Sequence, residues 1–321
     1  MTLEISKRLL FGMMRIRHVE ESIAARYSEQ TMRCPTHLCT GQEAVSAAAG
    51  LVLRKSDFAV SGHRAHGHYL GKGGDLRAML AEIYGKKTGC AGGRGGSMHL
   101  IDESVGFMGS TAIVGNTIPV GVGLGLSIQL AGGDAVSCVF LGDGAVETGV
   151  FFESLNFAAV RNLPVLFVCE NNLYSVYSPL SVRQPKGRKI FQLAQAIGVT
   201  AEHGDGNDAN LVYDMMEAAV TAIRAGHGPR FLEFDTYRWR EHCGPNFDND
   251  IGYRSEQEYR EHRAKEPIQA LRDRLMQAGL LTPEDIAVAE ASMIAEIDDA
   301  FSFALASPFP DGADVATHIY A

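Results

Sequence analysis

The sequence predicts an α/β fold, with a mainly parallel sheet flanked by helices and a helical C-terminal extension. Two apolar runs, residues 136–141 and 164–169, have the length and composition of buried parallel strands. Between them, residues 149–162 carry apolar side chains at helical spacing. Because β-α-β crossovers are right-handed, both strands should end at one edge of the sheet, where open α/β sheets bind ligands.

Further elements are predicted on both sides of this unit. An amphipathic helix is expected near the N-terminus, and a strand at residues 229–237 extends the parallel sheet. The segment 238–253 is polar and aromatic, contains Gly and Pro and has no apolar period, which is typical of an active-site loop after a strand. The predicted helices cover residues 3–30, 42–53, 76–84, 112–133 and 209–225.

The chain is expected to form one α/β domain over residues 1–254, with the N-terminal helix included. Residues 255–321 are expected to form a helical extension packed on the same domain. Within it, Thr282 followed by Pro283 has the pattern of a helix N-cap with proline at the first helical position. No repeat or linker divides the 321 residues.

Composition excludes several functions. The formal net charge is −9 and basic residues do not cluster, so nucleic-acid binding has no electrostatic support. No segment is apolar enough for a membrane span. The glycine-dense loop 89–97 lacks the Gly-Lys-Ser/Thr ending of a P-loop, which excludes nucleoside triphosphate binding there. Six scattered cysteines without Cys-x-x-Cys spacing indicate a reduced, cytoplasmic chain.

The two predicted strand ends carry polar residues suited to a metal ion. Gly142-Asp143-Gly144 follows the first strand, and after an interval of 26 residues Asn171-Asn172 follows the second. A carboxylate, an amide oxygen and a main-chain carbonyl suit Mg²⁺, which completes its octahedron with phosphate oxygens and water. Glycines beside Asp143 allow the backbone to approach those phosphates closely.

This spacing resembles the thiamine diphosphate signature, in which Mg²⁺ joins the cofactor's diphosphate to the protein. The resemblance implies a thiamine diphosphate-binding fold, with Asp143 and Asn172 as side-chain ligands of Mg²⁺ and Tyr174 giving its backbone carbonyl. It also implies that Gly144 and Ala145 line the diphosphate.

The whole chain resembles the alpha subunits of 2-oxo acid dehydrogenases of the pyruvate and acetoin type. His37-Leu38-Cys39 with Gly41-Gln42-Glu43-Ala44, Gly95 to His99, Ile113-Val114-Gly115 and the metal motif match in order. The resemblance implies that Ala112 and Val114 present their backbone to the aminopyrimidine and that His37 faces the substrate. It also implies that His242 lies near the reactive carbon of the cofactor.

His63 and Arg64 are predicted to contact the diphosphate, because a guanidinium fork matches phosphate oxygens. Residues 61–67 match the Tyr-Arg-Ala-His-Gly stretch of these subunits, with His63 in place of tyrosine. A surface role for Arg64 is the alternative. His63, His66 and His68 could instead form a zinc site, although no acidic or cysteine partner stands at ligand spacing.

The loop around His242 departs from the family pattern. These subunits usually read Gly-His-Ser here, whereas this chain has Glu241-His242-Cys243. The serine that is phosphorylated in some relatives is absent, and the identity of the acyl acceptor is left open. Cys243 is interpreted as a loop residue, since thiamine chemistry needs no thiol nucleophile.

The resemblance implies a half-site. The activating glutamate comes from a beta subunit with the pyrimidine-binding domain, and two alpha and two beta subunits form a heterotetramer. We expect decarboxylation of a 2-oxo acid such as pyruvate, or cleavage of acetoin, with acyl transfer to a lipoyl acyltransferase. A carboligase or ketol transferase with an aldehyde acceptor is the first alternative, and a catalytically silent cofactor-binding subunit is the second.

Overall fold

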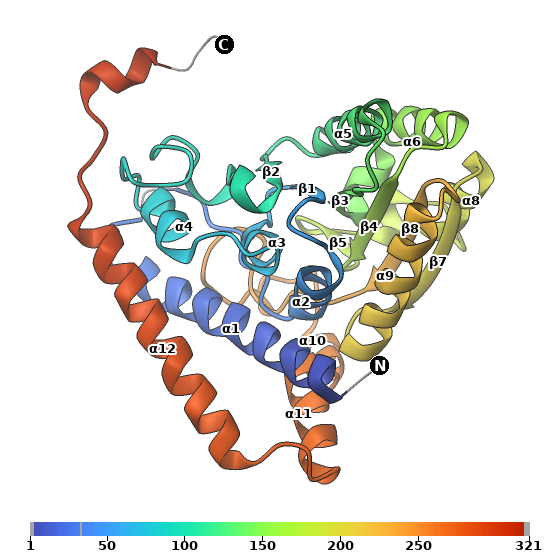
Figure 1. Ribbon diagram of the computed structural model, residues 1–321. Helices are drawn as coiled ribbons and strands as arrows, with labels where there is room; N and C mark the ends of the chain where they lie inside the picture. Colours follow the sequence, from blue (N-terminus) through green and yellow to red (C-terminus); the bar gives the residue numbers. More distant parts are fainter. Residues whose placement is uncertain (1–2, 33, 318–321) are drawn as a thin grey trace.

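The centre of the protein is a sheet of six parallel strands. The computed structural model describes residues 3–32 and 34–317, so the predicted extension is seen only as far as residue 317. The strand order is β2-β1-β3-β4-β8-β7 (Figure 1). The strands are β1 Phe58–Ser61, β2 Phe107–Ser110, β3 Ser137–Gly142, β4 Val165–Asn171, β7 Thr200–Asp205 and β8 Arg230–Asp235, and a separate antiparallel hairpin joins β5 Tyr174–Ser175 to β6 Ser178–Pro179.

Helices surround this sheet on both faces. They are α1 Leu3–Tyr27, α2 Glu43–Val52, α3 His66–Gly71, α4 Leu76–Ile83, α5 Thr117–Ala131, α6 Gly149–Arg161, α7 Leu180–Arg183, α8 Ile190–Ile197, α9 Ala209–Arg224, α10 Glu256–Arg263, α11 Pro267–Gln277 and α12 Pro283–Ala306. Helices α5 and α8 pack on one side of the strands, with α6 against both of them. Helix α9 packs on the other side, with α2 against it (Figure 1).

The alternating direction of side chains along β4 explains why helices pack on both faces of the sheet. Successive side chains of a strand point to opposite faces, so an entirely apolar strand can serve two cores. Val165, Phe167 and Cys169 belong to the apolar cluster that includes α5, α6 and α8. Leu166 and Val168 belong to the cluster that includes α1, α2 and α9. All five side chains are fully buried, which accounts for the unbroken apolar run in the sequence.

The predicted β-α-β unit is confirmed. Strand β3 lies parallel to β4, with Gly142 opposite Glu170 in the register, and α6 connects them. Strand β8 then pairs with β4 on its other side. Asp143 and Asn172 therefore leave neighbouring strands at the same edge of the sheet.

The prediction of a helix over residues 112–133 is wrong at its start. Helix α5 begins at Thr117, five residues later. Gly115 has a φ of +83°, which a right-handed helix does not contain, so residues 112–116 form a turn before the helix. Strands β2 and β7 were not predicted, because their sequences contain glycines and polar residues instead of an apolar run.

The C-terminal helices pack against the N-terminal part of the chain. Figure 1 shows α12 running beside α1, and ion pairs join the two: Arg15 to Glu296 at 2.6 Å and Arg26 to Asp298 at 3.1 Å. The predicted N-cap is confirmed, since the Thr282 side chain and Asp285 form a reciprocal capping box. None of the helices in the described residues is both long and apolar enough to cross a membrane.

Candidate functional site

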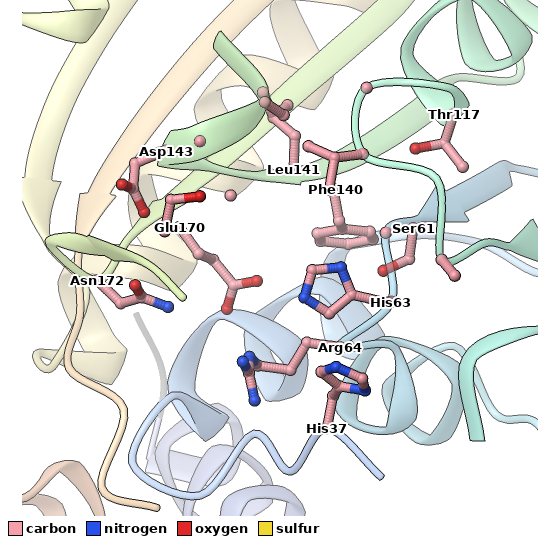
Figure 2. Close-up of a pocket in the computed structure, with 18 of the residues that line it drawn as sticks. His37, Ser61, His63, Arg64, Thr117, Phe140, Leu141, Asp143, Glu170 and Asn172 are labelled. Atoms are coloured by element: carbon pink, nitrogen blue, oxygen red, sulfur yellow. The ribbon is translucent and has the colours of Figure 1, made fainter. Parts of the chain in front are cut away.

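A pocket opens at the carboxyl edge of the parallel strands. Every one of the predicted site residues lines it: His37, His63, Arg64, Ala112, Val114, Asp143, Gly144, Ala145, Asn172, Tyr174 and His242. They come from six separate segments of the chain. Figure 2 shows Asp143, Glu170 and Asn172 on one side, facing Arg64, His63 and His37 on the other.

Asp143 is buried directly after β3. Its side chain is only 2% exposed and forms an ion pair with Arg183 of α7. Burial raises the pKa of the Asp143 carboxyl, and the Arg183 guanidinium partly opposes that increase. Arg183 also donates to Oε1 of Glu147 at 2.5 Å. The carboxylate of Asp143 thus already has a cationic partner, which shows that this position accommodates positive charge.

The two asparagines at the end of β4, Asn171 within the strand and Asn172 directly after it, differ in their surroundings. Asn171 is buried, and its amide donates to Glu233 Oε1 at 2.8 Å while its Oδ1 accepts from the Leu173 N–H at 3.1 Å. Asn172 lines the pocket instead, and its Oδ1 accepts from the Tyr174 N–H at 3.3 Å. Its amide donates to Gln42 at 3.4 Å. Asn171 therefore shapes the turn, and Asn172 is the asparagine available to a ligand.

The turn that follows is conformationally restricted. Leu173 and Val176 have φ values of 73° and 55°, and a β-branched residue such as Val176 is an outlier in this left-handed region. Such strain persists only where the surroundings enforce it, and it clusters at ligand sites. Ser175, between them, lies against Gly144: a Cβ on Gly144 would stand 2.7 Å from Ser175 Oγ.

These residues fit a Mg²⁺ ion and a diphosphate. Asp143, Asn172 and the carbonyl of Tyr174 offer hard oxygen donors of the kind that Mg²⁺ prefers. Gly144 leaves no room for a side chain, as close backbone approach requires. Arg64 supplies a guanidinium on the opposite wall. The fit rests on the donor types and on the crowded glycine.

Arg64 is held by main-chain carbonyls. Its guanidinium donates to Leu38 O at 2.5 Å and to His242 O at 3.2 Å, so one side chain links the loops that carry His37 and His242. Burial and the nearby Arg238 lower its pKa to about 10. Arg64 is therefore still charged at neutral pH and can meet an anion.

Three imidazoles gather beside Arg64. The ring centroids of His37 and His63 lie 4.6 Å apart, those of His37 and His242 5.0 Å, and those of His63 and His242 5.3 Å. Burial, followed by the charge of Arg64, lowers their pKa values to about 2 for His37, 4 for His63 and 3 for His242. All three rings are neutral at pH 7.

The structure does not group His63 with His66 and His68, so the alternative zinc site is wrong. His66 is fully buried, and its two ring nitrogens are hydrogen-bonded to Glu20 at 2.6 Å and to Ser97 at 2.8 Å. His68 is hydrogen-bonded to Ser61 at 2.8 Å and stacks on Phe140. Both histidines have other partners.

The loop that carries His242 is anchored by a buried ion cluster. Asp248 forms ion pairs with Arg254 and, at 3.5 Å, with Arg238, and it accepts from the Tyr253 hydroxyl at 2.6 Å. Arg254 donates to the Arg238 carbonyl at 2.6 Å, which joins the two ends of the loop. Next to His242, Cys243 is exposed, and partial burial followed by the charge of Glu241 raises the pKa of its thiol, which disfavours the reactive thiolate.

Several residues of the pocket escaped prediction. Glu170 lines it, and its Oε2 lies 2.9 Å from Nε2 of His68. A charged residue near the end of an otherwise apolar strand was a usable signal. Gln42 lies in a motif of the resemblance, but its contact with Asn172 depends on the tertiary fold, as does the contact of Arg183 with Asp143 beside the pocket.

Comparison with known proteins identifies the family. The family model described as dehydrogenase E1 component matches residues 11–312. The pyruvate dehydrogenase E1 component subunit alpha, somatic form, of Rattus norvegicus is 34% identical over 310 residues, 96% of this chain and 77% of the rat protein. The chloroplastic subunit alpha-3 of Arabidopsis thaliana is 35% identical over 325 residues, 99% and 74% of the two chains.

A bacterial relative is similar over nearly its full length. The pyruvate dehydrogenase E1 component subunit alpha of Rickettsia felis is 32% identical over 308 residues, which are 96% of this chain and 93% of that protein. Both the matched family model and these relatives span almost all of the sequence. The chain therefore belongs to the dehydrogenase E1 component family, as an alpha subunit of the thiamine diphosphate-dependent 2-oxo acid dehydrogenase type.

Proposed function

We propose that this chain binds the Mg²⁺-diphosphate end of thiamine diphosphate in a pyruvate-type or acetoin dehydrogenase. The observation that carries the proposal is the placement of Asp143 and Asn172 opposite Arg64 in the pocket (Figure 2), which Tyr174 also lines. Asp143 and Asn172 would hold the metal by side-chain oxygens and Tyr174 by its carbonyl. His63, Gly144 and Ala145 would line the diphosphate, and the backbone of Ala112 and Val114 the aminopyrimidine.

The chain's own residues would orient the reactants and handle protons. Thiamine diphosphate, when bound, supplies the nucleophile and the electron sink for cleavage of a bond next to a carbonyl. His37 and His242 are proposed as the catalytic residues, because a neutral imidazole can accept a proton or donate a hydrogen bond at the substrate. Arg64 would keep a positive charge beside the diphosphate.

We infer that a beta subunit completes the site. The turn beside the pocket exposes Ile113 and Val114 to 66% and 50%, and Leu130 and Val160 on α5 and α6 are 75% and 74% exposed. A protein–protein contact at this side of the pocket would cover such exposed apolar side chains. The partner would bring the pyrimidine-binding domain and its activating glutamate, in an α2β2 heterotetramer. Acyl transfer to a lipoyl acyltransferase would follow, and six unpaired cysteines favour a reducing, cytoplasmic setting.

The test is to co-express the chain with its beta subunit and offer pyruvate, acetoin and related oxo acids. A decarboxylation or cleavage product that depends on Mg²⁺ and thiamine diphosphate, together with acylation of a lipoyl domain, is the expected result. Asp143→Ala should abolish Mg²⁺-dependent cofactor binding in calorimetry. Unchanged cofactor binding in that variant would overturn the assignment of the metal site.

A carboligase with an aldehyde acceptor is the second candidate, because the His242 loop carries Glu241 and Cys243 in place of the usual Gly and Ser. Product analysis with pyruvate and aldehydes separates the two. A new C–C bond without lipoyl acylation would favour the carboligase, and lipoyl acylation alone would favour the dehydrogenase.

A further inference from the structure

Three histidines from three different loops meet in the pocket. His37 precedes α2, His63 lies between β1 and α3, and His242 follows β8. One ring nitrogen of each can be chosen so that all three lie within 4.8 Å of one another. The loops of His63 and His242 follow strands β1 and β8, whereas the loop of His37 connects α1 to α2. Arg64 joins the loops of His37 and His242 by hydrogen bonds to the carbonyls of Leu38 and His242.

The three rings are available as metal ligands. Their lowered pKa values keep them neutral at pH 7, and neutral imidazole is the form that binds metals. His37 is 6% exposed, and its Nδ1 has no hydrogen-bond partner among the residues that the structure describes. A buried polar atom of this kind normally has a partner, and a bound ion is one kind of partner that would satisfy it.

We propose that His37, His63 and His242 form a binding site for a divalent transition-metal ion such as Zn²⁺, separate from the oxygen-ligand site at Asp143 and Asn172. Three protein ligands with one open position are a common arrangement for tetrahedral zinc. Imidazole nitrogen favours zinc over magnesium, whereas carboxylate and carbonyl oxygens favour magnesium. The chemistry of the two donor sets therefore separates the two ions.

Assembly of the site requires only small movements. Zn–N bonds of about 2.0–2.1 Å place tetrahedral ligand atoms roughly 3.3 Å apart, so the three nitrogens must move closer than their present limit of 4.8 Å. His63 and His242 are partly exposed and can adjust. The charge of Arg64 opposes a cation here, although its guanidinium is directed to the carbonyls of Leu38 and His242.

This histidine site is independent of the proposed function, but a metal ion bound there would affect catalysis. A metal ion bound by His37 and His242 would remove both imidazoles from contact with substrate. Zinc is therefore expected to inhibit turnover by occupying this site, without displacing Mg²⁺ from Asp143.

The experiment uses the full chain, treated with a chelator and titrated with Co²⁺. One equivalent should give the intense visible absorption of tetrahedral Co²⁺, and Zn²⁺ should displace it. His63→Tyr, which introduces the tyrosine found in the related motif, should weaken Co²⁺ binding at least tenfold, and so should His242→Asn. Thermal unfolding of both variants checks that they fold, and either variant alone decides the outcome.

Two control variants locate the ion. His203 lies with Glu233 and Asp235 in the other candidate metal cluster among the described residues, so His203→Asn should leave the Co²⁺ signal unchanged. Asp143→Ala should also retain it, even when cofactor binding is lost, which separates this inference from the proposed function. Wild-type Co²⁺ affinity in either folded histidine variant, or loss of the signal in either control, would overturn the proposal.

Discussion

The guanidinium of Arg183 is in direct contact with the carboxylate of Asp143, the predicted metal ligand. The two side chains are 9% and 2% exposed, so this is a buried ion pair. Since Arg183 also contacts Glu147, it can keep a carboxylate partner if a metal ion takes one oxygen of Asp143. Because this ion pair is buried, the stability of the region depends on a positive charge beside Asp143.

Arg183→Gln should therefore destabilise the protein without ligands by about 3 kcal/mol, the typical loss when one partner of a buried ion pair is removed. Added Mg²⁺ and thiamine diphosphate should restore much of this loss, because the ion replaces the missing positive charge and bound ligand stabilises the folded state. Urea unfolding with and without the ligands measures both effects. An equal loss of unfolding free energy with and without the ligands would show that the metal ion does not replace the positive charge of Arg183.

The histidine cluster predicts a pH dependence of stability. The pKa of His37 is about 2 in the folded protein, against 6.5 for an ordinary histidine. Because the folded pKa is lowered, the unfolded state binds more protons as pH falls below 6.5, and stability is lost in that window. At pH 5, His37 alone should cost about 2 kcal/mol relative to pH 7.5.

The measurement is urea unfolding of wild type and His37→Asn at pH 7.5 and pH 5. The variant should lose about 2 kcal/mol less on acidification. His227 is exposed, so His227→Asn is the matched control and should behave as wild type. The same acid sensitivity in all three proteins would contradict a neutral, buried His37.

The sequence was sufficient to predict that Asp143 and Asn172 lie at one edge of the sheet, because the local apolar pattern and the rules of β-α-β topology lead to the same arrangement. Two apolar runs with a helix between them predict two parallel strands joined by a right-handed crossover. The ends of these strands bring Asp143 and Asn172 together without help from distant segments. Strand β7 was missed for the opposite reason. Its burial alternates irregularly, and Glu202 and His203 are exposed on it, so no period-2 pattern distinguishes it from a loop.

Side-chain partners between distant segments were beyond prediction. The contact between Asp143 and Arg183 spans 40 residues, and that between Asn172 and Gln42 spans 130. No local rule selects such pairs. The histidines illustrate both sides of this limit: the family resemblance placed His37, His63 and His242 at one site, but the partners of His66, which are Glu20 and Ser97, come from distant segments.

Gly144 provides a test of the proposal that the backbone after β3 lies close to the diphosphate. An added Cβ would stand 2.7 Å from Ser175 Oγ and 3.1 Å from its Cβ, so Gly144→Ala must push the strained turn away. We expect cofactor binding to weaken at least tenfold in calorimetry. Gly149→Ala is the control, because a Cβ there meets nothing within 4 Å and alanine is favoured over glycine in a helix. Equal affinities in the two variants would contradict a close approach at Gly144.

Asp248 tests whether the ion cluster positions the His242 loop. Asp248 is 3% exposed between Arg238 and Arg254, so Asp248→Asn leaves two buried guanidinium groups without a carboxylate. We expect a loss of about 3 kcal/mol in unfolding free energy. Asp250 is exposed two residues away, and Asp250→Asn should change stability by less than about 0.5 kcal/mol.

A positioning role predicts more than lost stability. If Asp248 holds the loop closed, limited proteolysis of Asp248→Asn should cut within residues 238–254 at temperatures where the rest of the chain stays folded, because cleavage follows the population of the locally opened state. The imidazole of His242 should then titrate nearer its ordinary pKa in NMR, since opening removes the burial that lowers it to about 3. An intact loop with an unchanged His242 titration would mean that Asp248 stabilises the fold but does not position the histidine.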